Sequence, residues 1–249
     1  MKHIVSLSGG TASAVAANRV MQRKGKDNVI LWFADTSWED EDLYRFLIDL
    51  ENFWDKEIVR YKDGRNPLQV GEDVKFILNS RIRACSRILK QEAFRKYLKK
   101  LEKPVTIHLG MDWTEEHRMA APKNNYEQFE GVKVSFPLMW KPWYKSKYSK
   151  IVEKWGIEIP RLYKMGFPHN NCGGRCIAQG KREWKRLGHY FPERYNEVMN
   201  WEEKMREELG TAKGKTILKD ITLRDLKKVK VKNIPNFTAE DSYGCFCAY

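Results

Sequence analysis

Small and hydroxyl-bearing residues follow the first apolar segment of the chain, Lys2 to Leu7, and precede an alanine-rich stretch. Glycine lets a backbone turn tightly, and the first N–H groups of a following helix attract anions. The pattern predicts a phosphate-binding loop that consists of Ser6, Ser8, Gly9, Gly10, Thr11 and Ser13. The loop has neither the Gly-Lys-Ser/Thr ending of a Walker loop nor the glycine spacing of a dinucleotide-binding loop.

A second apolar run, Asn28 to Phe33, leads into Asp35 and Thr36. Ligands of open parallel sheets bind outside the carboxyl ends of the strands. Asp35 and Thr36 are therefore placed to contact a ribose or a base edge. The alternative is that they only cap the helix that follows.

The chain has five cysteines and no apparent secretion signal. An odd number of cysteines in such a chain favours metal binding or thiol redox chemistry over a disulfide framework. Cys172 and Cys176 flank a glycine-rich turn, while Cys245 and Cys247 form a second pair near the end of the sequence. Basic residues around Cys85 would lower the pKa of its thiol if they lie close to it.

Thiolates are ligands for iron–sulfur clusters and for zinc, and two ligand sets are compatible with the spacing. In the first, a [4Fe–4S] cluster is bound by Cys85, Cys172 and Cys176, with a fourth ligand from the tail or an open iron. In the second, zinc is bound in a closed structural site by Cys172, Cys176, Cys245 and Cys247. The third alternative has no metal, and the cysteines perform thiol redox chemistry.

Apolar runs alternate with helical patterns along the first part of the chain. Strands are predicted at 2–7, 28–33, 56–60, 105–109 and 132–136, and helices at 12–22, 40–53, 86–100, 145–155 and 192–209. Continuous apolar strands that alternate with helices are typical of a parallel sheet covered on both faces. We expect an α/β nucleotide-binding domain over residues 1–140 and a mostly helical, cysteine-containing region over 141–249.

The net charge is +13, from 46 Lys and Arg against 33 Asp and Glu. Such an excess favours anionic partners, among them nucleotides and nucleic acid. No run of 18 apolar residues occurs, and the first residues read as a strand and a turn. The sequence therefore predicts a soluble cytoplasmic protein without a membrane partner.

Several motifs together carry a family resemblance. The Ser-x-x-Gly-Gly-x-x-Ser pattern of residues 6–13 resembles the PP-loop of the adenine nucleotide α-hydrolase-like superfamily. Four further segments are similar to its phosphoadenylyl sulfate (PAPS) reductase branch, which includes phage-encoded proteins: 33–36, 83–90, 110–118 and 166–176. The resemblance covers most of the chain.

The resemblance implies a Rossmann-like, HUP-type sheet that binds ATP or a related adenine nucleotide. It places Gly110 and Arg118 at the nucleotide site, with Arg118 on a phosphate, and it implies catalytic roles for Cys85 and for a nucleophilic cysteine in the tail, Cys247. Where the family's loop usually carries Asp, this sequence has Ala12. That departure counts against cleavage of ATP to pyrophosphate.

Three functions are compatible with these features. The leading hypothesis is ATP-dependent thiolation of a nucleic acid, tRNA or DNA, with an iron–sulfur cluster and a sulfur-donor protein. The first alternative is a sulfonucleotide reductase, in which a cysteine attacks the sulfate sulfur and a thiol partner resolves the thiosulfonate. The second is a module that senses nucleotides or binds nucleic acid without catalysis.

Overall fold

The computed structural model describes residues 1–141, 146–210 and 215–229, and the side chains of residues 146 and 147 are not considered. Cys245 and Cys247, with the metal and nucleophile roles predicted for them, lie outside the described residues. Three of the five cysteines are described, namely Cys85, Cys172 and Cys176, and all three carry free thiols.

The described chain forms five strands and a larger set of helices. The strands are β1 (Lys2–Leu7), β2 (Val29–Asp35), β3 (Ile58–Lys62), β4 (Val105–Leu109) and β5 (Val132–Ser135). The longer α-helices are α1 (Thr11–Lys24), α2 (Glu41–Trp54), α7 (Ser146–Lys154), α9 (Lys181–Tyr190) and α10 (Pro192–Glu208). The shorter ones are α3 (Pro67–Asp73), α4 (Ala84–Ser86), α5 (Ala93–Lys99), α6 (Ala120–Tyr126), α8 (Arg161–Lys164) and α11 (Leu223–Lys228). The 3₁₀ helices are η1 (Lys26–Asn28), η3 (Trp113–Arg118), η4 (Pro137–Trp140) and η5 (Asn171–Gly174), and η2 (Arg87–Glu92) is a π-helical turn.

The five strands form one parallel sheet in the order β3-β2-β1-β4-β5. Val5 of β1 lies opposite Leu31 of β2 on one side and His108 of β4 on the other. The strand order reverses at β1, so the loops after β1, β2 and β4 meet at the carboxyl edge of the sheet. The parallel α/β fold predicted from the sequence is confirmed.

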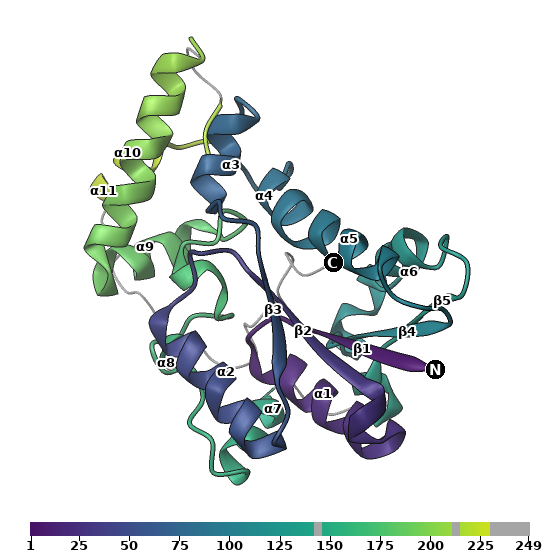
Figure 1. The fold of residues 1–249 in the computed structure, drawn as a ribbon. Coiled ribbons are helices and arrows are strands. Elements are labelled where there is room, and N and C mark those ends of the chain that lie inside the picture. Colours follow the sequence, from purple (N-terminus) through teal and green to yellow (C-terminus); the bar gives the residue numbers. More distant parts are fainter. Residues whose placement is uncertain (142–145, 211–214, 230–249) are drawn as a thin grey trace.

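Helices cover both faces of the sheet (Figure 1). Alternate residues of one strand point to opposite faces, as in β2, where Leu31 and Phe33 pack with α1, α2 and α7 while Trp32 packs with α5 and α6. Trp32 therefore belongs to the core beneath α5. Both layers bury nearly continuous apolar strands, which is why the strands were recognisable in the sequence.

A third core lies beyond the carboxyl edge of the sheet and joins α3 with α9, α10 and α11 (Figure 1). Trp184, Leu187, Val198 and Trp201 fill it, together with Cys172 of the glycine-rich turn. Every described element after β5 is helical, as the sequence predicted. The domain boundary near residue 140 stays a prediction.

Two helical segments near the site differ in how regular they are. Asn66 and Gln69 form a reciprocal capping box with Pro67 at the first helical position, which explains why α3 begins there. The segment from Ala84 to Lys99 starts as α-helix, passes through a π turn at η2, and continues as α5.

Apart from the residues left undescribed, each helix is too short or too polar to cross a membrane.

A pair of buried histidines joins β1 to β4. Nδ1 of His3 lies 3.0 Å from Nε2 of His108, and His108 is 1% exposed. Burial lowers the pKa of His108 to about 3, and burial also lowers the pKa of His3. The unfolded chain takes up a proton near pH 6.5 and the folded chain does not. Stability should therefore fall as the pH drops from 6.5 toward 3.

Replacing His108 with Gln should weaken this sensitivity to acid. Between pH 7 and pH 5, the wild-type free energy of unfolding should fall by about 2 kcal/mol more than that of the variant, since the variant lacks one proton-binding group. Urea titrations at the two pH values measure the difference. Equal losses for the two proteins would contradict this account of the histidine pair.

Candidate active site

The loop between β1 and α1 is shaped by its own serines. The Ser13 hydroxyl donates to the Gly10 carbonyl at 2.8 Å and lies 3.2 Å from both the backbone nitrogen and the hydroxyl of Ser8. Gly10 caps α1 without a side-chain hydrogen bond, and the first turn of α1 carries no acidic residue. The first N–H groups of a helix have no partner within the helix, so this loop presents donors suited to an anion.

Close packing requires glycine at two positions around the loop. Gly9 has φ +74°, and a Cβ there would lie 2.6 Å from Cδ1 of Leu43. At the end of β4, a Cβ on Gly110 would lie 2.9 Å from Cα of Ser13. Gly110 thus lets the end of β4 approach α1 and helps to seat the loop. Thr11 is buried, with its hydroxyl 3.4 Å from that of Ser149 in α7.

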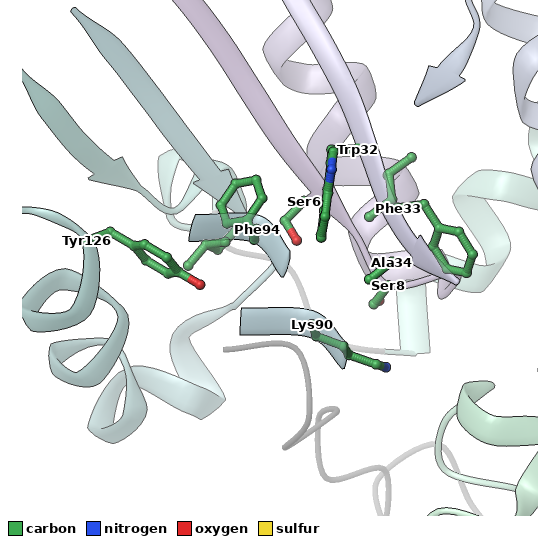
Figure 2. A pocket seen from close by; sticks show the side chains of 10 residues that line it. Ser6, Ser8, Trp32, Phe33, Ala34, Lys90, Phe94 and Tyr126 are labelled. Atoms are coloured by element: carbon green, nitrogen blue, oxygen red, sulfur yellow. The ribbon is translucent and has the colours of Figure 1, made fainter. Parts of the chain in front are cut away.

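A cavity opens at the carboxyl ends of β1, β2 and β4, on the face covered by α5. It is lined by Ser6, Leu7, Ser8, Trp32, Phe33, Ala34, Lys90, Phe94, Leu109 and Tyr126. Figure 2 shows aromatic rings and hydroxyls around one space, with Lys90 on the helical segment across from Ser6 and Ala34. Aromatic walls with hydroxyls and one cation suit a base attached to phosphate.

A second cavity lies beside the first and contains the described cysteines. It is lined by Thr36, Pro67, Arg83, Cys85, Ser86, Leu89, Lys90, Cys172, Cys176, Ile177 and Ala178. Cys85 comes from α4, whereas Cys172 lies in η5 and Cys176 follows it. The structure thus brings together three cysteines that are separated by up to 91 positions in the sequence.

Lys90 lines both cavities. It lies in the π turn η2, and its side chain is half-buried. Burial raises the pKa of the Cys85 thiol, and the charge of Lys90 opposes that rise more than Arg83 does. The neighbouring basic residues therefore do not lower the pKa of Cys85 below its ordinary value, because desolvation outweighs them.

The cysteine cavity does not by itself form a metal site. Within residues 1–141, 146–210 and 215–229, no group of three or more His, Cys, Asp or Glu side chains is arranged to hold a metal ion. Cys85, Cys172 and Cys176 share a cavity but do not form a ligand set. A cluster or a zinc ion does not fit the described residues as they stand.

The residues after β2 are held by protein partners. Asp35 accepts hydrogen bonds from the Ser37 backbone and from the Tyr44 hydroxyl, both at 2.8 Å. The Thr36 hydroxyl donates to Glu39 at 2.8 Å, and Thr36 lines the cysteine cavity. Asp35 lines neither of the two cavities. Its contact with a ribose stays a prediction.

Arg118 lines neither of these two cavities; it lies at the end of η3, where it is ion-paired with Glu115. The predicted site residues that line one of these two cavities fall into two groups. Ser6 and Ser8 face the first cavity, and Cys85, Cys172, Cys176 and Thr36 face the second. The phosphate role of Arg118 stays a prediction.

Hydrogen bonds connect the cysteine turn, the segment around Cys172, to the loops after β1 and β2. The Asn170 amide donates to the Gly9 carbonyl at 3.3 Å, and Arg175 donates to the Trp38 carbonyl at 2.9 Å. The Cys172 backbone N–H donates to Glu39. Each of these bonds joins residues more than 130 positions apart in the sequence, and together they hold the cysteine turn over the glycine loop.

The sequence profile of the phosphoadenosine phosphosulfate reductase domain matches residues 2–190, well over half of the chain. The chain belongs to this family. Among solved structures, it is similar to the phosphoadenylyl-sulfate (PAPS) reductase from Candida auris in its phosphate complex, with 16% sequence identity and a TM-score of 0.49. That alignment covers 67% of this chain and 79% of that chain. No curated protein matches the sequence.

Lys90 belongs to one of the sequence motifs of this phosphoadenosine phosphosulfate reductase family member. The motif did not predict that Lys90 lines two cavities. Trp32, Phe94 and Tyr126 were also missed, because apolar strand and helix residues look the same whether they line a cavity or fill a core. Trp32 is 2% exposed, and its indole N–H has no hydrogen-bond partner within the described chain. A ligand acceptor would satisfy this buried donor.

Asp40 joins the start of α2 to the C-terminal region. Its side chain is fully buried and accepts from Arg161 at 2.9 Å, from Arg194 at 2.7 Å and from the Asp42 backbone. Burial alone would raise the pKa of Asp40, but the bonds from the two arginines hold it below its ordinary value. Arg194 also donates to the Gly173 carbonyl, which connects this cluster to the cysteine turn.

Replacing Asp40 with Asn should lower the free energy of unfolding by about 2 kcal/mol, because two guanidinium groups lose the buried carboxylate and keep only their ion pairs with the exposed Glu41, while the helix cap is kept. Arg161 is 39% exposed, which places the effect below that of a fully buried pair. Chemical denaturation measures it. The Asp55→Asn variant, which disrupts an exposed ion pair with Lys26, is the control and should change stability far less than Asp40→Asn does. Equal losses of stability in the Asp40→Asn and Asp55→Asn variants would contradict the stabilising role of the buried Asp40 carboxylate.

Proposed function

We propose that this protein is an adenine-nucleotide-dependent enzyme of the sulfonucleotide reductase type. The observation that carries the proposal is that Lys90 lines both the nucleotide-type cavity and the cavity of Cys85, Cys172 and Cys176. In this proposal the phosphates lie at the Ser8–Ser13 loop and the adenine lies against the aromatic walls. Lys90 faces the sulfate between the two cavities, where a fixed cation stabilises developing negative charge.

The proposed reaction has two steps. A cysteine thiolate attacks the sulfate sulfur, so that an S–S bond forms, the S–O bond to phosphate breaks, and the nucleoside phosphate leaves. A thiol of a partner protein then attacks the cysteine sulfur of this thiosulfonate, which releases sulfite and leaves a mixed disulfide. The two thiols together supply the two electrons that reduce sulfate to sulfite. The nucleophile is Cys247 on the family resemblance, with Cys85 as the alternative.

Single-turnover labelling tests this function. The reduced protein is mixed with ³⁵S-labelled PAPS or adenylyl sulfate in the absence of any other thiol, and the cysteine peptides are separated. The proposal expects one labelled peptide and stoichiometric release of nucleoside phosphate. Adding a small thiol should release labelled sulfite. If neither sulfonucleotide labels the protein, the reductase function is wrong.

A second candidate function is ATP-dependent thiolation of tRNA or DNA with a [4Fe–4S] cluster. Two observations favour it: three cysteines share one cavity, and residues 81–103 beside it carry nine Lys and Arg against two Glu. The described cysteines would have to rearrange, and further ligands would have to come from Cys245 or Cys247. Zinc bound by Cys172, Cys176 and the two tail cysteines is the structural alternative.

Metal and sulfide analysis separates these candidates. Protein purified without oxygen should contain about four irons and four sulfides per chain if a cubane cluster is present, and about one zinc without sulfide if the site is structural. The thiolation candidate also expects release of pyrophosphate from ATP that depends on added tRNA or DNA. Metal-free protein that forms the thiosulfonate would support the reductase alone.

A further inference from the structure

Glu39 connects the two parts of the candidate site through its carboxylate. The Thr36 hydroxyl donates to Oε1 at 2.8 Å, and the Cys172 backbone N–H donates to Oε2. The exposed fractions of Glu39, Thr36 and Cys172 are 6%, 1% and 7%. One buried carboxylate therefore connects the end of β2 to a cysteine 133 positions further along the chain.

Cys172 is held in a backbone conformation that cysteine seldom adopts. Its φ is +53°, in the left-handed region, and it is followed by Gly173 and Gly174 with φ of +56° and +79°. A side chain with a Cβ is disfavoured there, so surrounding contacts must hold it. Two consecutive glycines directly after Cys172 give the backbone freedom to leave this conformation once such a contact is lost.

We infer that Glu39 is a positioning residue that keeps the Cys172 thiol in the cavity shared with Cys85 and Cys176, by accepting the Cys172 N–H while it is anchored to Thr36. The role deepens the proposed function, because the cysteine cavity adjoins the nucleotide-type cavity at Lys90. Removing both acceptor oxygens should let the turn relax and should expose the Cys172 thiol.

The test measures the alkylation rate of each cysteine by peptide mapping after timed exposure to iodoacetamide, with reduced full-length protein and no nucleotide. Glu39→Met, which keeps the size of the side chain but has no acceptor, should raise the rate at Cys172 about tenfold. Cys85 and Cys176 should stay within about twofold. Glu39→Gln retains one acceptor for the Cys172 N–H and can donate to the Thr36 oxygen, so it should restore a near wild-type rate.

Glu202 offers a matched control. It is 0% exposed and accepts two backbone N–H groups, from Ile217 and Leu223, at 2.8 and 2.7 Å. Glu202→Met should cost stability in the same way without changing the rate at Cys172. If Glu39→Met does not fold, Glu39→Asp replaces it, since the shorter carboxylate cannot reach both donors.

Two results would overturn the inference. One is an unchanged Cys172 rate in Glu39→Met, and the other is an equal rise in Glu202→Met or at all cysteines. A separate titration with adenosine 3′,5′-bisphosphate shows whether the nucleotide site exists. If wild-type protein binds neither this nucleotide nor AMP, the nucleotide released from adenylyl sulfate, but Cys172 still responds to Glu39→Met, the proposed function fails while the positioning role stands.

Discussion

Replacing Gly10 with Asp should abolish nucleotide binding and leave the fold intact. Gly10 caps α1, and Asp is at least as good a cap as Gly, so the variant should keep its fold once the Tyr163 side chain moves aside for the new Cβ. Its carboxylate would lie where the loop offers donors to a phosphate. Two negative charges about 4 Å apart repel by roughly 4 kcal/mol at an effective dielectric of 20, which corresponds to about a thousandfold weaker binding. Calorimetric titration with adenosine 3′,5′-bisphosphate measures the affinity.

The matched control for this experiment is Gly10→Ala. A Cβ at this position would lie 2.7 Å from the Tyr163 hydroxyl, the far end of a side chain that can move aside. Binding by Gly10→Ala should therefore stay within about tenfold of wild type. If Gly10→Asp bound the nucleotide as tightly as wild type, the phosphate would not lie at this loop.

Replacing Lys90 with Met should lower kcat/KM for sulfonucleotide reduction about a thousandfold, and nucleotide affinity only about tenfold. The difference arises because Lys90 faces both cavities, while the loop at α1 and the aromatic walls still hold the nucleotide. Loss of its charge should also raise the pKa of the Cys85 thiol further, since Lys90 opposes the effect of burial. Alkylation of Cys85 at a fixed pH should accordingly slow.

Lys96→Met is the control for Lys90→Met, because Lys96 lies in the adjoining α5 with its side chain exposed. It removes the same charge from the same helical segment and should leave activity and the Cys85 rate within about twofold. Equal losses in the two variants would show that the general positive charge of this segment matters, and that the position of Lys90 between the cavities does not.

The sheet and the glycine loop could be predicted because local sequence patterns determine them. Strands β1 and β4 have the predicted bounds, and α1 begins one residue before the predicted start. Apolar runs that end in glycine or hydroxyl residues locate the carboxyl edge of a parallel sheet without any long-range contact. For the same reason Cys172 and Cys176 were recognised as a pair on one turn.

The remaining parts of the site depend on contacts between distant segments. The hydrogen bond from Cys172 to Glu39 joins residues 133 positions apart in the sequence. The left-handed conformation of Cys172 could not be predicted, because cysteine normally avoids that conformation. Helical periodicity predicted one regular helix over 86–100, whereas the structure contains a π turn there. Both features were set by tertiary packing, which single-sequence patterns do not contain.

The π turn at η2 has a consequence for how relatives are compared. A π turn holds one residue more than the α-helical turn it replaces, which rotates everything on one side of it by about 100° relative to the other. Cys85 and Lys90 can therefore line the cysteine cavity while Ala93 and Leu98 pack in the sheet core. An ungapped alignment with a relative that has a regular helix here would pair residues whose side chains point about 100° apart around the helix axis. One gap inside Arg87–Glu92 restores the correspondence.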